Sequence, residues 1–196
     1  MDKVNISRIA VFCASALGHN NDYSVVASEL GKTLSDLKME LIYGGSSTGL
    51  MGAVANSVIN NGGDAIGILP NFLQRQEVAH LNLTKLEFTN GMHERKARMN
   101  ALADAFVILP GGLGTLDELF EMLTWKQLGL HAKPIVLLNS GGFFNDLIKF
   151  LEAIGLKGFL KTEINDLFYT CKSVKECITF LQKKLTINNC DQLIDK

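Results

Sequence analysis

The stretch Ala105-Phe106-Val107-Ile108-Leu109, followed by Pro110-Gly111-Gly112-Leu113-Gly114, decides the fold of this chain. Five apolar residues in a row do not suit a strand with one wet face, so both faces of this strand must be covered. The glycines end the strand, and a helical pattern follows over residues 115–128. A buried strand that leads through a glycine turn into a helix is typical of a parallel sheet.

The same unit, a short apolar run and then a helical pattern, recurs on both sides of this stretch. The expected strands are residues 9–13, 41–43, 65–69, 83–88, 105–109 and 134–138, with a short one near Phe168. The expected helices are residues 23–37, 50–59, 92–103, 115–128, 144–154 and 174–185. This alternation predicts an α/β fold, a Rossmann-like doubly wound parallel sheet with helices on both faces. We expect a single domain over residues 1–196, with a peripheral tail from about residue 185.

Composition narrows the range of partners. Apolar residues make up 47% of the chain and charged residues 20%, which is typical of a globular protein. The net charge is −1 and no basic block stands out, which argues against a nucleic-acid polymer and favours a small ligand. The sequence has neither an apolar run of the ~20 residues that span a membrane nor a signal-peptide pattern, so we expect a cytoplasmic location. The four cysteines and four histidines show no metal-binding spacing, so reduced thiols and no metal site are expected.

Three loops at the ends of expected strands are rich in small residues. They are residues 13–18, 44–52 and 110–118. Glycines at a strand–helix junction let backbone N–H groups converge on an anion, and the helix dipole adds to this attraction. Because such sheets bind ligands at the carboxyl ends of their strands, these loops are candidate phosphate cradles. The alternative, that the glycines serve only tight packing, stays open for each loop.

Two familiar phosphate-binding motifs do not fit these loops. Residues 44–49 have the glycine spacing of a P-loop, but Leu50 stands where that motif requires lysine. After Gly112 and Gly114, Asp117 occupies the position of the third glycine of a dinucleotide-binding motif. We therefore expect neither a nucleoside triphosphatase nor a dinucleotide-dependent dehydrogenase.

Charged residues lie near the start of two expected helices. Arg95 and Lys96 precede the most buried strand, and a guanidinium suits phosphate, although such a pair is often solvated surface. Glu118 follows Thr115 at the spacing of a helix capping box. On local grounds, capping explains Glu118 at least as well as catalysis does.

Two longer motifs resemble a known family. The segment Met92-His93-Glu94-Arg95-Lys96 contains M-H-x-R-K, and residues 110–118 contain P-G-G-x-G-T-x-x-E. Both motifs, at this separation, closely resemble the LOG (LONELY GUY) family of cytokinin riboside 5′-monophosphate phosphoribohydrolases. The resemblance extends over about residues 8–160.

The resemblance implies hydrolysis of the N-glycosidic bond of an adenine-type nucleoside 5′-monophosphate, a cytokinin nucleotide or AMP, to free base and ribose 5-phosphate. It also implies a homodimer, no metal or organic cofactor, and Arg95 and Glu118 as the catalytic pair. Members often carry the label lysine decarboxylase, but such enzymes need pyridoxal phosphate held by a lysine, and no site of that kind is apparent in the sequence. The remaining substrate- and phosphate-binding residues expected from the motifs and the glycine loops are Ser15, Gly44, Gly45, Gly49, Glu77, Lys96, Gly111, Gly112, Leu113, Gly114, Thr115 and Thr124.

The chain departs from the family's pattern in two loops. Ala14-Ser15-Ala16 stands where relatives often have Gly-Ser-Ser, and Gly44-Gly45-Ser46-Ser47 stands where Gly-Gly-Gly-Asn is common. Recognition of the base and ribose therefore stays open. So do the individual roles: Glu118 could stabilise a ribosyl cation, bind ribose hydroxyls or orient water, and Arg95 could neutralise phosphate or polarise the base.

The alternative function is a non-catalytic carrier of a phosphorylated small molecule, such as the molybdenum cofactor. A carrier needs glycine cradles but has no use for the catalytic pair.

The expected helix over residues 115–128 also predicts assembly. It is apolar on more than one side, through Leu119, Phe120, Met122, Leu123, Trp125 and Leu128. Such a helix must be buried on more than one side, and we expect part of that surface to meet a second copy.

Overall fold

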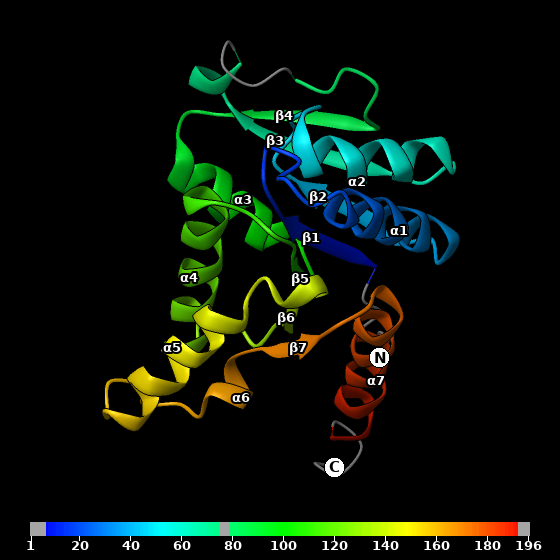
Figure 1. Ribbon diagram of the computed structural model, residues 1–196. Helices are drawn as coiled ribbons and strands as arrows, with labels where there is room; N and C mark the ends of the chain where they lie inside the picture. Colours follow the sequence, from blue (N-terminus) through cyan, green and yellow to red (C-terminus); the bar gives the residue numbers. More distant parts are fainter. Residues whose placement is uncertain (1–6, 75–78, 192–196) are drawn as a thin grey trace.

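Seven parallel strands form one sheet in the order β4-β3-β2-β1-β5-β6-β7 in a computed structural model of the chain (Figure 1). The structure describes residues 7–74 and 79–191, with side chains as far as residue 184. The strands are β1 (Arg8–Phe12), β2 (Glu40–Tyr43), β3 (Ala65–Pro70), β4 (Lys85–Thr89), β5 (Ala105–Ile108), β6 (Ile135–Leu138) and β7 (Tyr169–Cys171). The predicted α/β fold with a parallel sheet is confirmed, because every neighbouring pair of strands runs in the same direction.

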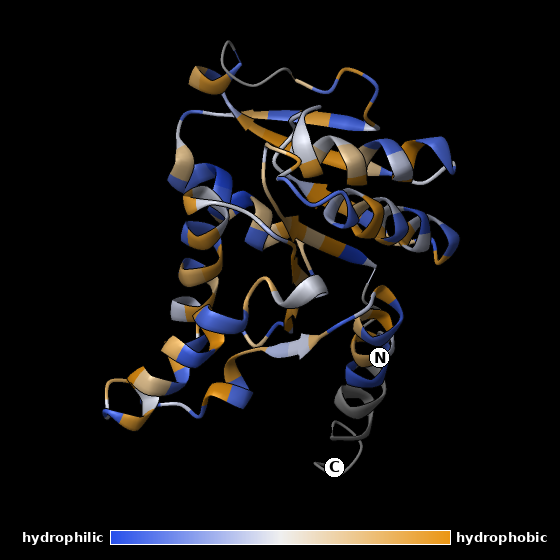
Figure 2. Cartoon of the chain, in the orientation of Figure 1, coloured by the Kyte–Doolittle hydropathy of each residue, from blue (hydrophilic) through white to orange (hydrophobic). Residues whose placement is uncertain are grey.

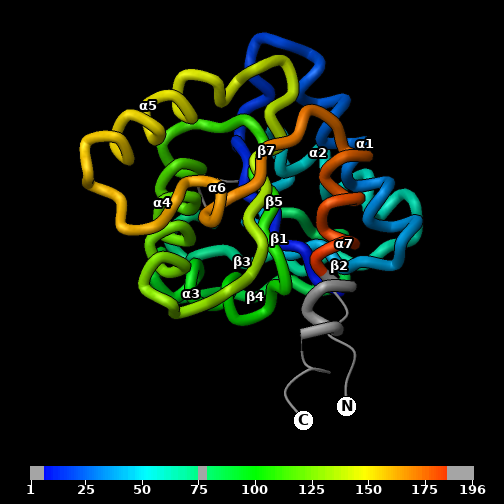
Figure 3. Tube along the Cα trace, turned by 90° about the horizontal axis from the view of Figure 1, so that it is seen from below, coloured from blue at the N-terminus to red at the C-terminus, as the bar shows by residue number. Residues whose placement is uncertain are grey.

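Helices cover both faces of the sheet. The helices are α1 (Asp22–Asp36), α2 (Gly49–Asn60), α3 (Met92–Leu102), α4 (Leu113–Gln127), α5 (Asn145–Leu156), α6 (Ile164–Leu167) and α7 (Val174–Asp191), with short 3-10 helices η1 (Asn71–Leu73) and η2 (Ser140–Gly142). In Figures 1 and 3, α1, α2 and α7 lie on one side of the sheet, and α3, α4 and α5 lie on the other. In the described part of the chain, no helix combines the length and apolar character needed to cross a membrane.

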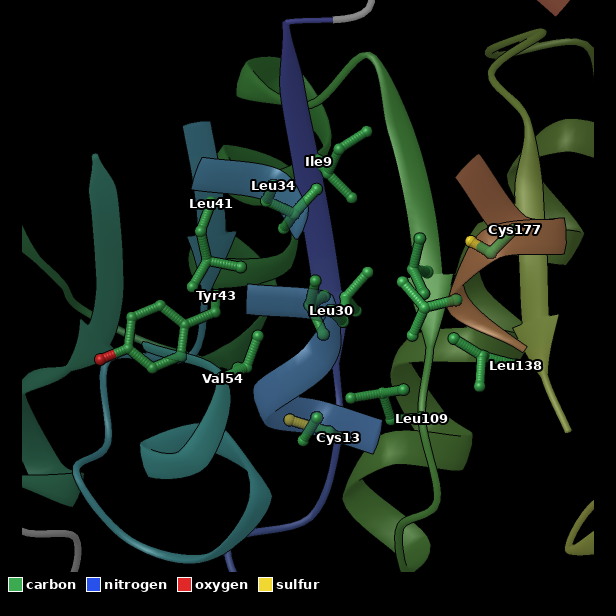
Figure 4. Close-up of a cluster of buried hydrophobic side chains, with 14 of the residues drawn as sticks. Ile9, Cys13, Leu30, Leu34, Leu41, Tyr43, Val54, Leu109, Leu138 and Cys177 are labelled. Atoms are coloured by element: carbon green, nitrogen blue, oxygen red, sulfur yellow. The ribbon is translucent and has the colours of Figure 1, made fainter. Parts of the chain in front are cut away.

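Strand residues alternate between two apolar clusters, one on each face. On β1, Ile9 and Val11 join the cluster under α1, α2 and α7, whereas Ala10 and Phe12 join the cluster under α3, α4 and α5. Figure 4 shows the first cluster, in which Leu30 of α1 lies over β1. The inner strands are mostly apolar, the edge strands β4 and β7 are less so, and hydrophilic residues alternate with apolar ones along the helices (Figure 2). All four residues of β5 are buried, as the apolar run predicted.

The strand order reverses between β1 and β5. Strands β2, β3 and β4 lie on one side of β1, and β6 and β7 lie beyond β5. The loops that follow β1 and β5 therefore lead to opposite faces and leave a crevice at the carboxyl edge of the sheet. The Ala14 N–H donates to the Pro110 carbonyl (3.1 Å), and the Leu50 N–H donates to the Ala14 carbonyl (3.0 Å). These bonds join the two loops and the start of α2 around the crevice.

Helix α4 begins two residues earlier than predicted, and this overturns the capping box. Gly112 is the N-cap residue, with an extended backbone (φ −91°, ψ −154°), so Leu113 is the first helical residue and Thr115 the third. A capping box requires the threonine at the N-cap itself. The interpretation of Thr115 and Glu118 as a capping box is therefore wrong. The helix starts early because Gly112 serves as the N-cap without a side-chain hydrogen bond. Thr115 and Glu118 therefore lie inside the helix, where both are buried.

Candidate active site

A cavity of about 310 Å³ opens at the crevice between β1 and β5. Its walls come from the loop after β1 and from the starts of α2, α3 and α4. The described lining residues are Cys13, Ala14, Ser15, Ala16, Met51, Arg95, Gly112, Leu113, Gly114, Thr115 and Glu118. The structure thus brings together Ser15, the catalytic pair predicted from the motifs, and most of the predicted cradle of α4.

The first turn of α4 forms the part of the cavity that suits an anion. Leu116 is the residue whose N–H donates to the Gly112 carbonyl (3.0 Å). The N–H groups of Leu113, Gly114 and Thr115 precede it, so they have no acceptor within the helix, and the positive end of the helix dipole lies there. A Cβ added to Gly112 or Gly114 would meet no atom within 4 Å. Packing therefore does not require these two glycines, and they leave room for a ligand to approach the backbone.

The glycines that follow β2 meet protein atoms instead. A Cβ on Gly44 would overlap the guanidinium of Arg95, and a Cβ on Gly49 would overlap the backbone of residues 15–16. Gly49 also has φ +60°, a conformation that glycine adopts most readily. Among the described residues that line the cavity, Gly44, Gly45 and Gly49 are absent. For this loop the packing alternative fits better, because its glycines let α3 and the β1 loop come close to the site.

Arg95 and Glu118 form a buried ion pair in the cavity. Arg95 Nη1 lies 3.6 Å from Glu118 Oε1, and the two side chains are 6% and 8% exposed. Arg95 Nε donates to the carbonyl of Ile68 on β3 (3.1 Å), which fixes the plane of the guanidinium. Since an unpaired charge is costly at this depth, each group stabilises the charge of the other.

Cys13, the buried residue that directly follows β1, lies next to this pair and remains a thiol. Burial raises the pKa of Cys13 well above its usual range, the Glu118 carboxylate raises it further, and Arg95 opposes the shift. Because the thiolate is the reactive form, Cys13 shapes the cavity and is not suited to act as a nucleophile. Cys13 and Met51 lie in two of the loops that the sequence analysis singled out, but they were not among its predicted binding residues. Their positions, directly after a buried strand and at the start of a helix, are the signals that could have found them.

Lys96 lies beside the cavity in a second ion-pair cluster. Its Nζ is 2.9 Å from Asp117 Oδ2 and 2.9 Å from Glu121 Oε2, and its side chain is 6% exposed. Burial lowers the pKa of Lys96, but the hydrogen bond to Asp117 and the ion pairs with Asp117 and Glu121 outweigh burial, so this pKa lies above its usual value. Lys96 is therefore a cation, and it is not among the described residues that line the cavity.

Two other predicted residues, Gly111 and Thr124, are not among the described residues that line the cavity, and the position of a third cannot be compared. Glu77 lies outside the described residues. Thr124 is exposed further along α4, where its hydroxyl donates to the Phe120 carbonyl (2.7 Å). Gly111 is required by packing, since a Cβ there would overlap the side chain of Thr115.

A second cavity, of about 200 Å³, adjoins the first. The two cavities share Ala14, Ala16 and Gly112. The other lining residues of the second cavity are Leu17, Gly18, Tyr23, Leu50, Pro110, Gly111 and Phe143. The alanines that depart from the family's pattern thus form the wall between a polar cavity and a largely apolar one.

Comparisons with known proteins agree on one family. A family described as "Possible lysine decarboxylase" matches residues 51–181. The chain is 39% identical to a cytokinin riboside 5′-monophosphate phosphoribohydrolase from Rhodococcoides fascians, over 89% of this chain and 88% of the relative. It is 41% identical to the cytokinin riboside 5′-monophosphate phosphoribohydrolase LOG of Oryza sativa subsp. japonica, over 90% of this chain and 73% of the relative.

Solved structures share the fold at lower identity. The Moco carrier protein of Chlamydomonas reinhardtii superposes with a TM-score of 0.70 and 23% identity, over 94% of this chain and 99% of that protein. The molybdenum cofactor binding protein of Rippkaea orientalis gives a TM-score of 0.69 and 20% identity, over 92% and 98% of the two chains. At these identities the likeness concerns the fold alone.

Proposed function

The chain belongs to the LOG family of cytokinin riboside 5′-monophosphate phosphoribohydrolases, and from this premise we propose that it hydrolyses the N-glycosidic bond of adenine-type nucleoside 5′-monophosphates. The products are the free base and ribose 5-phosphate. The observation that carries this proposal is the Arg95–Glu118 ion pair, buried in the same cavity as the open N-terminus of α4.

Breaking a ribosyl C–N bond develops positive charge on the sugar, and a carboxylate beside the ribose stabilises that charge. Glu118 has this role, and it also orients the attacking water and accepts its proton. Arg95 keeps Glu118 ionised and polarises the departing base. The N–H groups of residues 113–115 hold the 5′-phosphate, and this binding orients the reacting sugar although the phosphate itself does not react.

The apolar cavity supports a finer choice of substrate. It adjoins the cavity of the catalytic pair, and Leu17, Tyr23 and Phe143 give it an apolar surface of about the right size for a small hydrocarbon group. An isopentenyl substituent on the base would remove part of this surface from water. We therefore propose that a cytokinin nucleotide is preferred to AMP.

The test is to incubate the purified protein with AMP and with isopentenyladenosine 5′-monophosphate and to measure the free base by chromatography. Release of base from both, faster from the isopentenyl nucleotide, is the expected result. Binding of the nucleotides without release of base would instead favour a carrier. A carrier does not need the Arg95–Glu118 pair.

The description "Possible lysine decarboxylase" does not fit the cavity. A pyridoxal phosphate enzyme needs a lysine amine to hold its cofactor. No lysine is among the described residues that line the cavity, and Lys96 beside it is paired with two carboxylates. Carbon dioxide released from lysine on addition of pyridoxal phosphate would contradict the hydrolase proposal.

We also propose a homodimer and a cytoplasmic location. The dimer is supported by two exposed apolar side chains, Phe120 on α4 and Leu128 at its C-cap. The location is supported by the free thiols of Cys13, Cys171 and Cys177, which suit a reducing compartment. Cell fractionation with an antibody tests the location.

A further inference from the structure

Three carboxylates stand within five residues near the start of α4. They are Asp117, Glu118 and Glu121, and Glu118 and Glu121 are three positions apart, so they are neighbours on the helix surface. Neighbouring carboxylates repel one another, and repulsion favours protonation of one of them. The proposed mechanism needs Glu118 ionised. Something must therefore offset the other two charges.

Two cations of α3 face this cluster, and each of them pairs with different carboxylates. Arg95 is paired with Glu118, at 3.6 Å. Lys96, the next residue, is paired with Asp117 and Glu121, at 2.9 Å each. The Lys96 side chain is only 6% exposed, so bulk water screens its charge weakly, whereas the side chain of Asp117 is 56% exposed.

The other titratable groups near Glu118 add little charge. Directly after β1, Cys13 remains a neutral thiol. On α3, His93 Nδ1 lies 3.9 Å from Glu121 Oε1, and its side chain is 97% exposed. Glu94 turns to the start of its own helix, where it accepts hydrogen bonds from the Asn90 backbone and side chain (2.8 and 3.0 Å). Lys96 is thus the buried cation that balances Asp117 and Glu121.

We propose that Lys96 is a positioning residue that neutralises Asp117 and Glu121, so that Arg95 stays with Glu118 alone and Glu118 stays ionised beside the substrate. This inference rests on the proposed role of Glu118, and it gives Lys96 a task different from the substrate contact that the family resemblance implies. It also explains why adjacent cations on α3 are both buried, although such a pair usually lies in solvent.

The test compares Lys96→Met with the triple variant Lys96→Met/Asp117→Asn/Glu121→Gln. In the single variant, two uncompensated carboxylates flank Glu118, so the acidic limb of the kcat/KM profile should move up by about one pH unit or more. We expect kcat at neutral pH to fall roughly tenfold, while KM changes less than about threefold because no substrate contact is lost. The triple variant leaves no stranded charge, and its acidic limb should return to the wild-type position with most of kcat restored.

Arg98→Met is the matched control. Arg98 lies on the same helix and carries the same charge, but it is paired with Glu87 on β4, at 2.8 and 3.1 Å. Its loss removes one positive charge and one ion pair from α3 without touching the carboxylates of α4. We expect a lower melting temperature and an unchanged pH profile.

A second readout does not depend on activity. The ¹³C shift of the Glu118 carboxyl, identified by its absence in Glu118→Gln, is followed from pH 3 to 9 in the wild type and in Lys96→Met. Its midpoint should rise by about one unit in the variant. An inactive wild type would count against the proposed function. The titration would still test whether Lys96 keeps Glu118 ionised, because it does not depend on activity.

Two results would overturn the inference. The first is a Lys96→Met protein whose pH profile and Glu118 titration match the wild type. The second is a folded triple variant that stays as inactive as Lys96→Met with a strongly raised KM, which would make Lys96 a direct substrate contact. If Lys96→Met does not fold, the triple variant decides alone, because the proposal requires it to be active.

Discussion

At the scale of single residues, a missing methyl group at Gly44 decides where Arg95 lies. The guanidinium passes so close to the Cα of Gly44 that any Cβ would overlap Nη2, and the sulfur of Met51 lies on the same side. Both neighbours are the ends of flexible side chains, so the backbone could keep its course if they moved. Gly49 and Gly52 differ, because a Cβ there would meet backbone atoms.

Gly44→Ala should therefore fold yet lose activity. We expect Arg95 to be displaced from Glu118 and kcat to fall at least about tenfold, since the loss of one preorganised charged group typically costs more than that. The melting temperature should change by only a few degrees. Gly155→Ala in α5, where a Cβ would make ordinary contact at 3.7 Å, is the control and should keep full activity. An active Gly44→Ala protein would mean that the position of Arg95 is not critical.

Glu118→Gln separates charge from shape at the same site. The amide fits the space of the carboxylate but neither stabilises a ribosyl cation nor accepts a proton, so turnover should fall by roughly two orders of magnitude or more. Because Glu118 is the buried partner of Arg95 and not a cap, its loss should also cost roughly 1–3 kcal/mol of stability. Assays and melting curves are measured on one preparation, with Glu87→Gln as an ion-pair control away from the cavity. Near-wild-type turnover in the folded variant would remove Glu118 from the mechanism.

Residue patterns predicted part of this site. The motifs singled out Arg95 and Glu118, and the strand–helix junction singled out residues 112–115; the structure places all of them at one cavity. The sequence could not distinguish glycines that face a ligand from glycines that face protein, because the difference depends on which atoms of distant elements lie nearby. The partners of Lys96 were missed for the same reason, since Asp117 and Glu121 lie on another helix.

At the scale of elements, strands and long helices were predictable because apolar periodicity marks them along the chain. The start of α4 was not, since Gly112 ends the turn without a side-chain cap and the true N-cap carries no sequence signal of its own. The four-residue helix α6 is likewise too short for a period to appear. The edge strand β4 was predicted, but the ion pair between Glu87 on β4 and Arg98 on α3 was not.

The Glu87–Arg98 ion pair predicts that the packing of β4, at the edge of the sheet, is weakened by acid. The hydrogen bonds of Arg98 and Lys85 lower the pKa of Glu87 from 4.5 to about 2. Because the folded pKa is the lower one, this stabilisation is complete above about pH 4.5 and is lost as the pH falls toward 2. When the pH is lowered from 5 to 3, the melting temperature of Glu87→Gln should fall less than that of the wild type.

The control is Asp36→Asn, which breaks an exposed pair with Lys32 on α1. Exposed pairs contribute little, so its melting temperature should follow the wild-type curve. Parallel melting curves for Glu87→Gln and the wild type would show that β4 is held by other contacts.

At the scale of the whole molecule, α4 and its C-cap carry both Glu118, the proposed catalytic carboxylate, and exposed apolar side chains on another face. Leu119, Met122 and Leu123 face the core, while Phe120 and Leu128 are 38% and 66% exposed. Phe120, Thr124 and Leu128 follow one another at intervals of four residues, so they share one face of the helix. A second copy on this face would cover these side chains next to the cavity.

Phe120→Asp combined with Leu128→Asp should therefore give a monomer by light scattering at micromolar concentration, whereas the wild type gives a dimer. Two buried carboxylates would oppose any interface on this face. Phe150→Asp on α5, where the side chain is 62% exposed, is the control and should stay dimeric. A monomeric wild type would contradict the proposed homodimer.

The central claim is that the start of α4 binds a 5′-phosphate while Arg95 and Glu118 act on the sugar. It is tested most directly by the ratio of kcat/KM for isopentenyladenosine 5′-monophosphate to kcat/KM for isopentenyladenosine, measured on one enzyme preparation. Phosphate binding should favour the nucleotide by at least about a hundredfold, because the energy of holding the phosphate is used to orient the ribose. Equal values for the nucleotide and the nucleoside would contradict the account.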